Sequence, residues 1–412
     1  FFAFSMTGLV LSNNLFQTFL FWELVGLTSY LLIGFWFEKP SAATAGRKAF
    51  VINRLADLGF YLGIISLFIL TGTVSFLDMN SEFLKQMLSP QAVAVLGVLV
   101  FMGVMGKSAQ FPFHNWLPDA MEGPTPVSAL IHSATMVAAG VFLLTRAFLL
   151  FSASANTLLF ILVIGSLTAF VGAALAAIQR DIKKIMAYST ISQLGLMVMA
   201  VGAGSSAAGM FHLTTHAFFK SLLFLTAGSF IHHYHSNNIW EIAKKGGNRH
   251  TLAITALIFG LASLCGLPPF AGFFSKDMIL ETLKERSLLF YGIAIFVSFL
   301  TVYYSCRMLC VILLSKPDHH DHGHDSHAPA WPAGRHKTPF ILKISEALPL
   351  ISLAAISLFM GYLGSPLNSS LLRWLGAHED AHWDMGLLLT TAVLIIVGAG
   401  AAYAQFKDPE KA

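Results

Sequence analysis

Charged residues are scarce in this sequence. Of its 412 residues, only 11% are Asp, Glu, Lys or Arg, whereas 56% are hydrophobic and the mean hydropathy is +0.69. A soluble globular protein carries roughly 25% charged residues, so a body of 44.8 kDa built from this sequence could not cover its surface with polar groups. The composition excludes a water-soluble protein and predicts one that lies within a membrane.

Cysteine is also scarce, and the charges show no strong imbalance. Cys265, Cys306 and Cys310 lie in apolar runs, form no Cys-x-x-Cys motif and are too few for an iron–sulfur cluster, which needs four thiolates. The net charge is +4 and the charges are dispersed, so no nucleic-acid partner is expected. The sequence also shows no glycine-rich phosphate loop after a strand.

Long apolar runs dominate what is present. At about 20 apolar residues per crossing, the sequence has material for roughly eleven or twelve transmembrane helices. The runs do not alternate in hydrophobicity as the strands of a membrane barrel do, so helices are favoured. We predict an all-α polytopic membrane protein with about twelve transmembrane helices. The runs lie at about 1–12, 15–37, 47–71, 91–106, 126–151, 157–178, 184–202, 206–231, 251–266, 287–314, 346–364 and 385–404.

The chain is predicted to divide into three stretches. Residues 1–317 form a transmembrane core, 318–340 a polar loop, and 341–412 the C-terminal transmembrane helices. The loop is rich in histidine, but its spacing fits no particular metal geometry, so it predicts at most weak, adventitious binding of zinc or nickel. The chain begins without Met inside an apolar run, so we expect a fragment of a longer protein.

Two apolar runs are interrupted by prolines beside a lysine. In 106–112, Lys107 precedes a proline, and in 266–277 two prolines precede Lys276. Proline removes a backbone donor that lipid cannot replace, so such breaks must line protein or a wet cavity. Two breaks with one lysine each indicate two structural repeats that each contribute a broken helix to an ion path.

Several ionisable residues lie inside the apolar runs. Placing a charged side chain at membrane depth costs several kcal/mol of free energy. Glu23 has no basic neighbour within a helical turn, so its partner must come from another helix. Arg54 and Asp57 are three residues apart and are predicted to pair locally on one helix. A buried pair of this kind is more often structural than part of a proton path. The basic loop at 179–184, which includes Lys183 and Lys184, is interpreted as a cationic anchor.

A stripe of titratable residues follows further along. His212, His216 and Lys220 are spaced by four, which places them on one helix face over about 12 Å. His132 lies in another apolar helix, although a lone buried histidine is more often a satisfied core residue. Lysine, carboxylate and histidine can change charge when buried, whereas arginine stays protonated. We therefore predict a proton relay through Glu23, Lys107, His132, His212, His216, Lys220 and Lys276.

At these residues the sequence resembles a known family, the antiporter-like subunits of respiratory complex I, the proton-translocating NADH:quinone oxidoreductase. The segments that carry the resemblance are 22–36, 53–57, 106–132, 211–224 and 272–277. Among these subunits the distal, L-type chains (5-type in mitochondria) are the most similar. The resemblance covers nearly the whole sequence.

The resemblance implies a bundle of about fourteen helices with two inverted five-helix repeats, each containing a broken helix. This chain is then expected to lack the first three spans and a C-terminal lateral helix with its anchor. Glu23 and Lys107 match a couple on the side where protons enter, and the Arg54–Asp57 ion pair is expected to modulate that couple. The family's central hydrated axis is matched here by His132, His212, His216 and Lys220. The exit side of the family is matched by Lys276.

The function implied by the resemblance is that of a proton-translocating membrane subunit in which electron transfer from NADH to quinone drives pumping. The chain is expected to hold no redox cofactor, because NADH, FMN, iron–sulfur clusters and quinone are expected in other subunits. The implied partners are other membrane subunits of complex I, notably a neighbouring antiporter-like subunit, and the lipid bilayer. A bacterial cell inner membrane is the expected location.

Two other functions fit part of the pattern. A subunit of a multisubunit Na⁺/H⁺ antiporter, or of a related membrane hydrogenase or inorganic-carbon uptake complex, shares the same motifs. A haem-binding cytochrome would depend on His212 and His216. Four-residue spacing on one helix, however, cannot place both imidazoles on opposite sides of one iron. An absorbance spectrum without haem bands would exclude that function.

Overall fold

The computed structural model describes residues 1–315, 340–376 and 384–408. Within these ranges the secondary structure is helical, with isolated β-bridges and no strand. The predicted all-α class is therefore confirmed. The polar loop predicted at 318–340 falls outside the described residues except for its last position, and the division into three stretches stays a prediction.

Nine helical segments in the described ranges are long and apolar enough to cross a membrane. They are α2 (Leu15–Ile33), α3 (Pro40–Thr71), α5 (Pro90–Lys107), α7 with α8 (Thr125–Ser133 and Met136–Arg146), α10 (Ala155–Ile178), α11 (Ile182–Gly202), α16 (Leu288–Leu314), α17 with η4 (Phe340–Phe359 and Met360–Gly364) and α19 (Met385–Phe406). Two apolar helices are shorter, α1 (Phe2–Leu11) and α14 (Thr251–Cys265). The long helix α12 (Ser206–Tyr234) carries the histidine and lysine stripe. Each predicted apolar run falls on one of these helices.

Several helices begin where a polar side chain or proline favours it. The side chains of Asn14, Asp181 and Ser205 accept hydrogen bonds from backbone N–H groups in the first turns of α2, α11 and α12. Helix α3 begins at Pro40, before its apolar run, because proline is favoured in the first turn of a helix. Short helices fill the connections: α4 (Ser81–Met87), α9 (Phe148–Ser152), α13 (Ile239–Lys244), η3 (Gly247–Arg249) and α18 (Ser370–Trp374).

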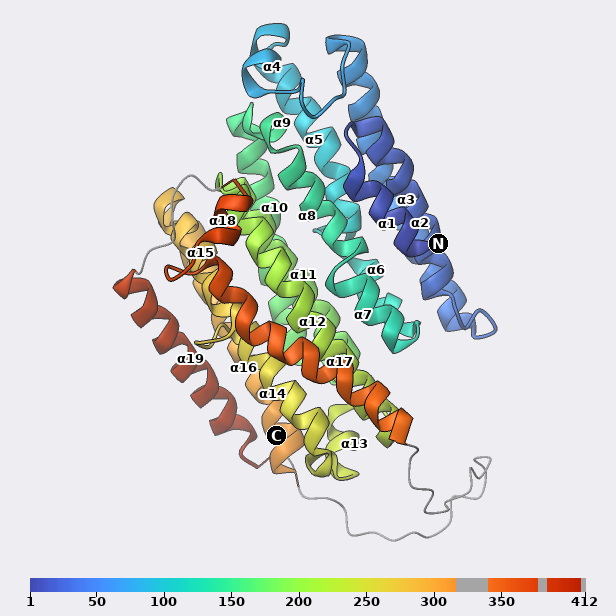
Figure 1. The fold of residues 1–412 in the computed structure, drawn as a ribbon, viewed down its shortest axis with the longest axis vertical. Coiled ribbons are helices and arrows are strands. Elements are labelled where there is room, and N and C mark those ends of the chain that lie inside the picture. The colour runs from blue at the N-terminus through green and yellow to red at the C-terminus, as the bar shows by residue number, and fades with distance from the viewer. Residues whose placement is uncertain (316–339, 377–383, 409–412) are drawn as a thin grey trace.

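The long helices lie side by side in one elongated bundle (Figure 1). Helices α1 to α3 lie at one side, α10 to α12 in the middle, and α14, α16 and α19 at the other side. Helix α11 is 94% buried over its apolar window, whereas α17 and α19 are only 22% and 17% buried. Helix α17 packs on α12 and α14, and α19 packs on α16. The two C-terminal helices therefore lie at the periphery.

The first predicted break is present. Helix α5 ends at Lys107, and the chain then passes through η1 (Phe113–Asn115), α6 (Trp116–Asp119) and η2 (Ala120–Glu122) before α7 begins. A second interruption follows that the sequence did not indicate. The apolar run at 126–151 is divided between α7, which ends at Ser133, and α8, which begins at Met136.

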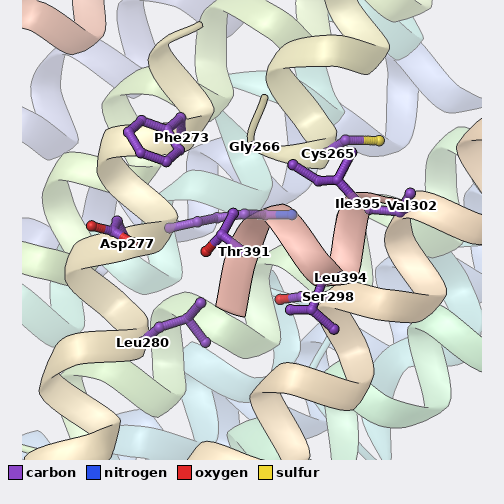
Figure 2. A pocket seen from close by; sticks show the side chains of 11 residues that line it. Cys265, Gly266, Phe273, Asp277, Leu280, Ser298, Val302, Thr391, Leu394 and Ile395 are labelled. Carbon is purple, nitrogen blue, oxygen red and sulfur yellow. The ribbon is translucent and has the colours of Figure 1, made fainter. Parts of the chain in front are cut away.

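The other predicted break separates α14 from α15 (Ala271–Arg286). Gly266 ends α14 with φ +79°, a left-handed conformation that favours glycine. A Cβ on Gly272 would lie 1.8 Å from the carbonyl oxygen of Ser263, so a larger residue would push the two half-helices apart. The break opens onto a pocket between α14, α15, α16 and α19 (Figure 2).

Candidate functional site

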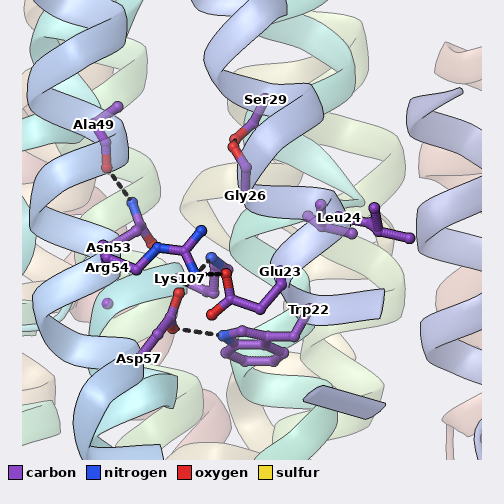
Figure 3. Close-up of polar contacts among 12 residues, drawn as sticks. Trp22, Glu23, Leu24, Gly26, Ser29, Ala49, Asn53, Arg54, Asp57 and Lys107 are labelled. Atoms are coloured by element: carbon purple, nitrogen blue, oxygen red, sulfur yellow. Dashed lines mark hydrogen bonds and ion pairs between the residues drawn. The ribbon is translucent and has the colours of Figure 1, made fainter. Parts of the chain in front are cut away.

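Two ion pairs join α2, α3 and α5 (Figure 3). The Nζ of Lys107 donates to Oδ2 of Asp57 at 3.0 Å, and both side chains are almost fully buried. The guanidinium of Arg54 pairs with the carboxylate of Glu23, and these side chains are 43% and 19% exposed. Glu23 thus finds its partner on another helix, as predicted.

The predicted local pairing of Arg54 with Asp57 is wrong. Asp57 is the buried member of the two and faces α5, where it neutralises the fully buried Lys107. Arg54 is more exposed and turns toward Glu23 on α2. The expected couple of Glu23 and Lys107 is therefore not a direct contact, because each of the two is paired with a residue of α3.

Lys107 lies in a cradle built largely by α2. Its Nζ is 5.6 Å from the ring centre of Trp22, in a cation–π arrangement, and the indole N–H of Trp22 donates to Oδ1 of Asp57 at 2.6 Å. Both carboxylate oxygens of Asp57 are thus engaged. A Cβ on Gly26 would lie 3.0 Å from the lysine Nζ, so the absence of a side chain there leaves room for the ammonium group.

His132 lies between the first break and α12. Its ring is 6.3 Å from that of Trp116 and 5.8 Å from that of Phe224. Neither ring nitrogen has a hydrogen-bond partner, although the residue is fully buried. A core histidine satisfied by protein groups is thus not what the structure contains. Buried polar atoms of this kind are normally satisfied by ordered water.

The interruption between α7 and α8 positions His216. The carbonyl oxygen of Ser133, at the end of α7, accepts a hydrogen bond from Nδ1 of His216 at 3.2 Å. A carbonyl only accepts, so Nδ1 carries the proton and Nε2 is left as the basic nitrogen. That Nε2 is buried and has no protein partner. The hydroxyl of Ser133 also accepts from that of Ser221 on α12 at 2.7 Å.

His212 connects α12 to the second broken helix. Its Nδ1 is 2.8 Å from the hydroxyl oxygen of Ser275, which precedes Lys276 on α15. Its Nε2 is 3.1 Å from Oε1 of Gln193 on α11. Because protein groups occupy both ring nitrogens, His212 is not arranged as a haem ligand, and the cytochrome hypothesis loses its support.

Lys220 and Lys276 are buried without a carboxylate partner in the described structure. The Nζ of Lys220 donates to the hydroxyl of Ser189 at 2.7 Å and to the carbonyl of Met186 at 3.3 Å. The Nζ of Lys276 donates to the carbonyl of Leu264 at 2.6 Å. Their charge is therefore compensated by neutral acceptors alone.

Lys276 also lines the pocket at the second break. Asp277, Ser298 and Thr391 add polar atoms to its wall (Figure 2). The Oδ1 of Asp277 and the hydroxyl of Thr391 are buried without a protein partner, so this pocket has unmet hydrogen-bonding capacity next to the lysine. The outer wall is α19, the least buried of the membrane-length helices.

Two buried cations escaped the sequence analysis. Lys183, interpreted as a loop anchor, is 5% exposed, and its Nζ donates to the carbonyls of Met121 and Gly123 at 2.7 and 2.9 Å. The anchor interpretation of Lys183 is therefore wrong. Arg307 in α16 donates to the carbonyl of Gln179 and lies against Trp240. An arginine inside an apolar run was the signal that could have identified it.

Metal binding has no support in the described residues. They contain no cluster of three or more His, Cys, Asp or Glu residues that could hold an ion. The three cysteines are free thiols. The histidine tract of the polar loop comprises His319, His320, His322, His324, His327 and His336, which lie outside the described residues.

Comparison with known proteins places these residues in a family context. Residues 12–301 match the family described as NADH:quinone oxidoreductase/Mrp antiporter, transmembrane. The chain is 44% identical to NAD(P)H-quinone oxidoreductase subunit 5 of Paulinella chromatophora, over 98% of this chain and 64% of the relative. It is 43% identical to chain 5 of the Synechocystis enzyme, over 89% and 59%. The chloroplast subunit 5 of Marchantia polymorpha is 50% identical over 74% and 46%. The chain thus spans roughly half to two thirds of these relatives.

Solved structures show the same fold. A chain of the Mrp complex from Dietzia superposes with a TM-score of 0.79 at 29% identity, over 99% of this chain and 45% of that one. A chain of an archaeal membrane-bound sulfane sulfur reductase superposes with a TM-score of 0.73 at 21% identity, over 97% and 76%. At that identity the second likeness concerns the fold alone.

Proposed function

Because the chain belongs to the NADH:quinone oxidoreductase/Mrp antiporter transmembrane family, we propose that it is a proton-translocating membrane subunit of an NAD(P)H:quinone oxidoreductase. The observation that carries this proposal is the series of buried ionisable residues that crosses the bundle from α2 to α15. Relatives at 43–50% identity are named as subunit or chain 5 of that enzyme, whereas the Mrp chain is 29% identical.

In this proposal protons enter near Glu23 and Lys107 and leave near Lys276. Lys107 keeps its proton while the Asp57 carboxylate faces it, so a shift of that carboxylate changes the proton affinity of the lysine. Arg54 cannot carry the proton, but its contact with Glu23 controls the charge beside the couple.

The middle of the path consists of groups that both accept and release protons. His132 and the Nε2 of His216 are buried without protein partners, and water between them would extend the path from the first break to α12. His212 then reaches Ser275, the residue before Lys276, through a hydroxyl contact, and Lys220 contacts the hydroxyl of Ser189.

Redox chemistry has no place in this chain in our proposal. NADH, FMN, iron–sulfur clusters and quinone belong to other subunits, and the partners are other membrane subunits, including a neighbouring antiporter-like chain. The relatives come from a cyanobacterium, a photosynthetic organelle and a chloroplast. A thylakoid membrane therefore fits as well as the bacterial inner membrane first expected.

Replacement of the terminal lysine tests the proposal. Lys276→Arg keeps a positive charge but cannot release a proton, so pumping should fall roughly tenfold or more, since positioned proton-transfer groups contribute about 10²–10⁴. Pumping is measured by acidification of inverted membrane vesicles during NAD(P)H oxidation. Lys107→Met and Glu23→Gln should also impair it. Lys48→Met, which removes an exposed pair with Asp119, is the matched control. Full pumping in all three relay variants would contradict the proposal.

A second candidate function is that of a cation/proton antiporter subunit. The observation in its favour is the superposition on the Mrp chain over 99% of this chain. The two candidates differ in their driving reaction. Pumping that stops when quinone reduction is blocked supports the oxidoreductase, whereas sodium-driven proton movement in the absence of NAD(P)H supports the antiporter.

A further inference from the structure

A buried hydroxyl pair links Lys220 to α16. The hydroxyl of Ser189 on α11 lies 2.7 Å from Nζ of Lys220 and 2.8 Å from the phenol oxygen of Tyr304. All three side chains are fully buried. Side chains from three helices, α11, α12 and α16, thus meet at the hydroxyl oxygen of Ser189. The relay predicted from the sequence includes neither Ser189 nor Tyr304.

Tyr304 also shares a buried cluster with the end of α14, next to the second break. It belongs to the same buried cluster as Leu264, whose carbonyl accepts the hydrogen bond from Lys276. Cys265, the next residue of α14, lines the pocket that contains Lys276. Tyr304 thus contacts Ser189, which binds Lys220, and interacts electrostatically with Cys265 at the edge of the Lys276 pocket.

We propose that Ser189 and Tyr304 form a hydroxyl step through which Lys220 exchanges its proton with the Lys276 side of the molecule. This inference rests on the proposed function and adds two residues to it. Serine and tyrosine hydroxyls both donate and accept, so each can receive a proton on one side while releasing one on the other.

The hydrogen bonds change with the charge of Lys220. While its ammonium group donates, Ser189 accepts from both Lys220 and Tyr304. Once Nζ is neutral, its lone pair can accept the serine O–H, and a continuous chain then runs from Tyr304 through Ser189 to Lys220. The direction in which the Ser189 hydroxyl donates its hydrogen bond thus depends on whether Lys220 is charged.

The proton balance of the step is closed. A water molecule on the Lys276 side gives a proton to the phenol oxygen, the phenol proton moves to Ser189, and the serine proton moves to Nζ of Lys220. One N–H bond forms on the lysine, the water regains a proton from Lys276, and both hydroxyls remain intact. The reverse sequence unloads Lys220.

The adjacent tyrosine provides a matched control. Tyr303 is partly exposed, and its hydroxyl donates to Gln405 of α19, away from the lysines. Tyr304→Phe and Tyr303→Phe each remove one oxygen from neighbouring positions of α16. We expect Tyr304→Phe to slow pumping by roughly tenfold, less than the 10²–10⁴ of a whole proton-transfer group because water replaces part of the path. Tyr303→Phe should pump normally.

The experiment uses the assembled complex in inverted vesicles. Pumping rates are measured in H₂O and in D₂O, because loss of a relay group makes proton transfer more rate-limiting and raises the solvent isotope effect. A loss of active complex alone would leave that effect unchanged. Ser189→Ala should behave like Tyr304→Phe, and the double variant should lose no more than either single variant, since both act in one step.

Lys220→Met separates the possible failures. If Lys220→Met stops pumping while Tyr304→Phe and Ser189→Ala match Tyr303→Phe in rate and isotope effect, the hydroxyl step is refuted and the proposed function stands. If Lys220→Met itself pumps normally, the proposed function fails and the hydroxyl step fails with it.

Discussion

Single residues of the proposed path differ in how their charge is compensated. Lys107 has the carboxylate of Asp57 and the face of Trp22, whereas Lys220 and Lys276 have only hydroxyl or carbonyl acceptors. A carboxylate stabilises the charged form of a buried lysine far more than a neutral acceptor does. Of these three lysines, Lys107 is therefore the one whose hold on its proton depends on the position of a carboxylate, that of Asp57.

Asp57→Asn tests this dependence. The amide oxygen can still accept from Trp22, but Lys107 loses its counter-charge, and an uncompensated buried charge costs about 3–5 kcal/mol. Lys107 avoids that cost by remaining neutral, so pumping in inverted vesicles should be largely lost while the complex still assembles. Asp119→Asn removes an exposed pair and should have little effect. Equal pumping by the two variants would contradict a role for the Lys107–Asp57 pair.

Most ionisable residues of the proposed path could be identified from the sequence, but most of their partners could not. Lysines and histidines inside apolar runs are visible because they break a composition rule. Which carboxylate faces Lys107 depends on how α3 is rotated between α2 and α5, and spacing along one helix does not determine that rotation. The role of Ser189 was invisible for a similar reason, because a serine in an apolar helix attracts no notice.

At the scale of elements, the long helices were predictable and one interruption was not. Prolines marked the breaks after α5 and α14. The end of α7 at Ser133 carries no such mark, because its neighbours at 134 and 135 are ordinary helix residues by composition. What distinguishes this position is tertiary contact, because Ser133 forms hydrogen bonds with His216 and Ser221 on α12.

Lys183 holds the segment after the first break against α11. Its Nζ donates to two carbonyls about sixty residues away, in and just after η2. Lys183→Met should leave both carbonyls unsatisfied, at roughly 1.5–3 kcal/mol for each hydrogen bond to the charged group, and lower the thermal unfolding midpoint of the purified protein by several degrees. Lys184→Ala, at the exposed neighbouring position, should leave the midpoint unchanged. Equal unfolding midpoints for the two variants would show that the hydrogen bonds of Lys183 contribute nothing to stability.

At the scale of the whole molecule, the central helices join the two broken-helix regions. Helix α12 contacts α7 and α8, which follow the first break, and also α14 and α15, which flank the second. The C-terminal helices are added from outside, and α19 is attached near its start by Asp384, which pairs with Lys284 of α15 at 2.6 Å. The exposed Lys284–Asp384 pair is thus a tether that holds the start of α19 to α15.

The tether should be insensitive to pH over the physiological range. The hydrogen bond from Lys284 lowers the pKa of Asp384 below its usual value, with help from the backbone N–H groups that its carboxylate caps. A lowered pKa contributes stability above the ordinary value and loses it only as the pH falls through the folded value. Amide exchange in the first turn of α19, corrected for intrinsic rates, should therefore show constant protection from about pH 8 to 5.

Asp384→Asn should speed exchange in that turn a few fold, because the charge on the tether is lost. Glu82→Gln, which alters an exposed pair on α4, serves as the control. Protection of α19 that declines steadily between neutral pH and pH 5 would show that another group controls its attachment.

The two ion pairs around α3 have a consequence in terms of electroneutrality. Glu23, Arg54, Asp57 and Lys107 contribute two negative and two positive charges, so the cluster is neutral when all four are ionised. An extra proton leaves it with one net positive charge in a medium that screens poorly. The cluster can therefore hold a transported proton only briefly, or only while a charge of opposite sign is near. This is the property expected of a gate, whereas a reservoir would store the proton.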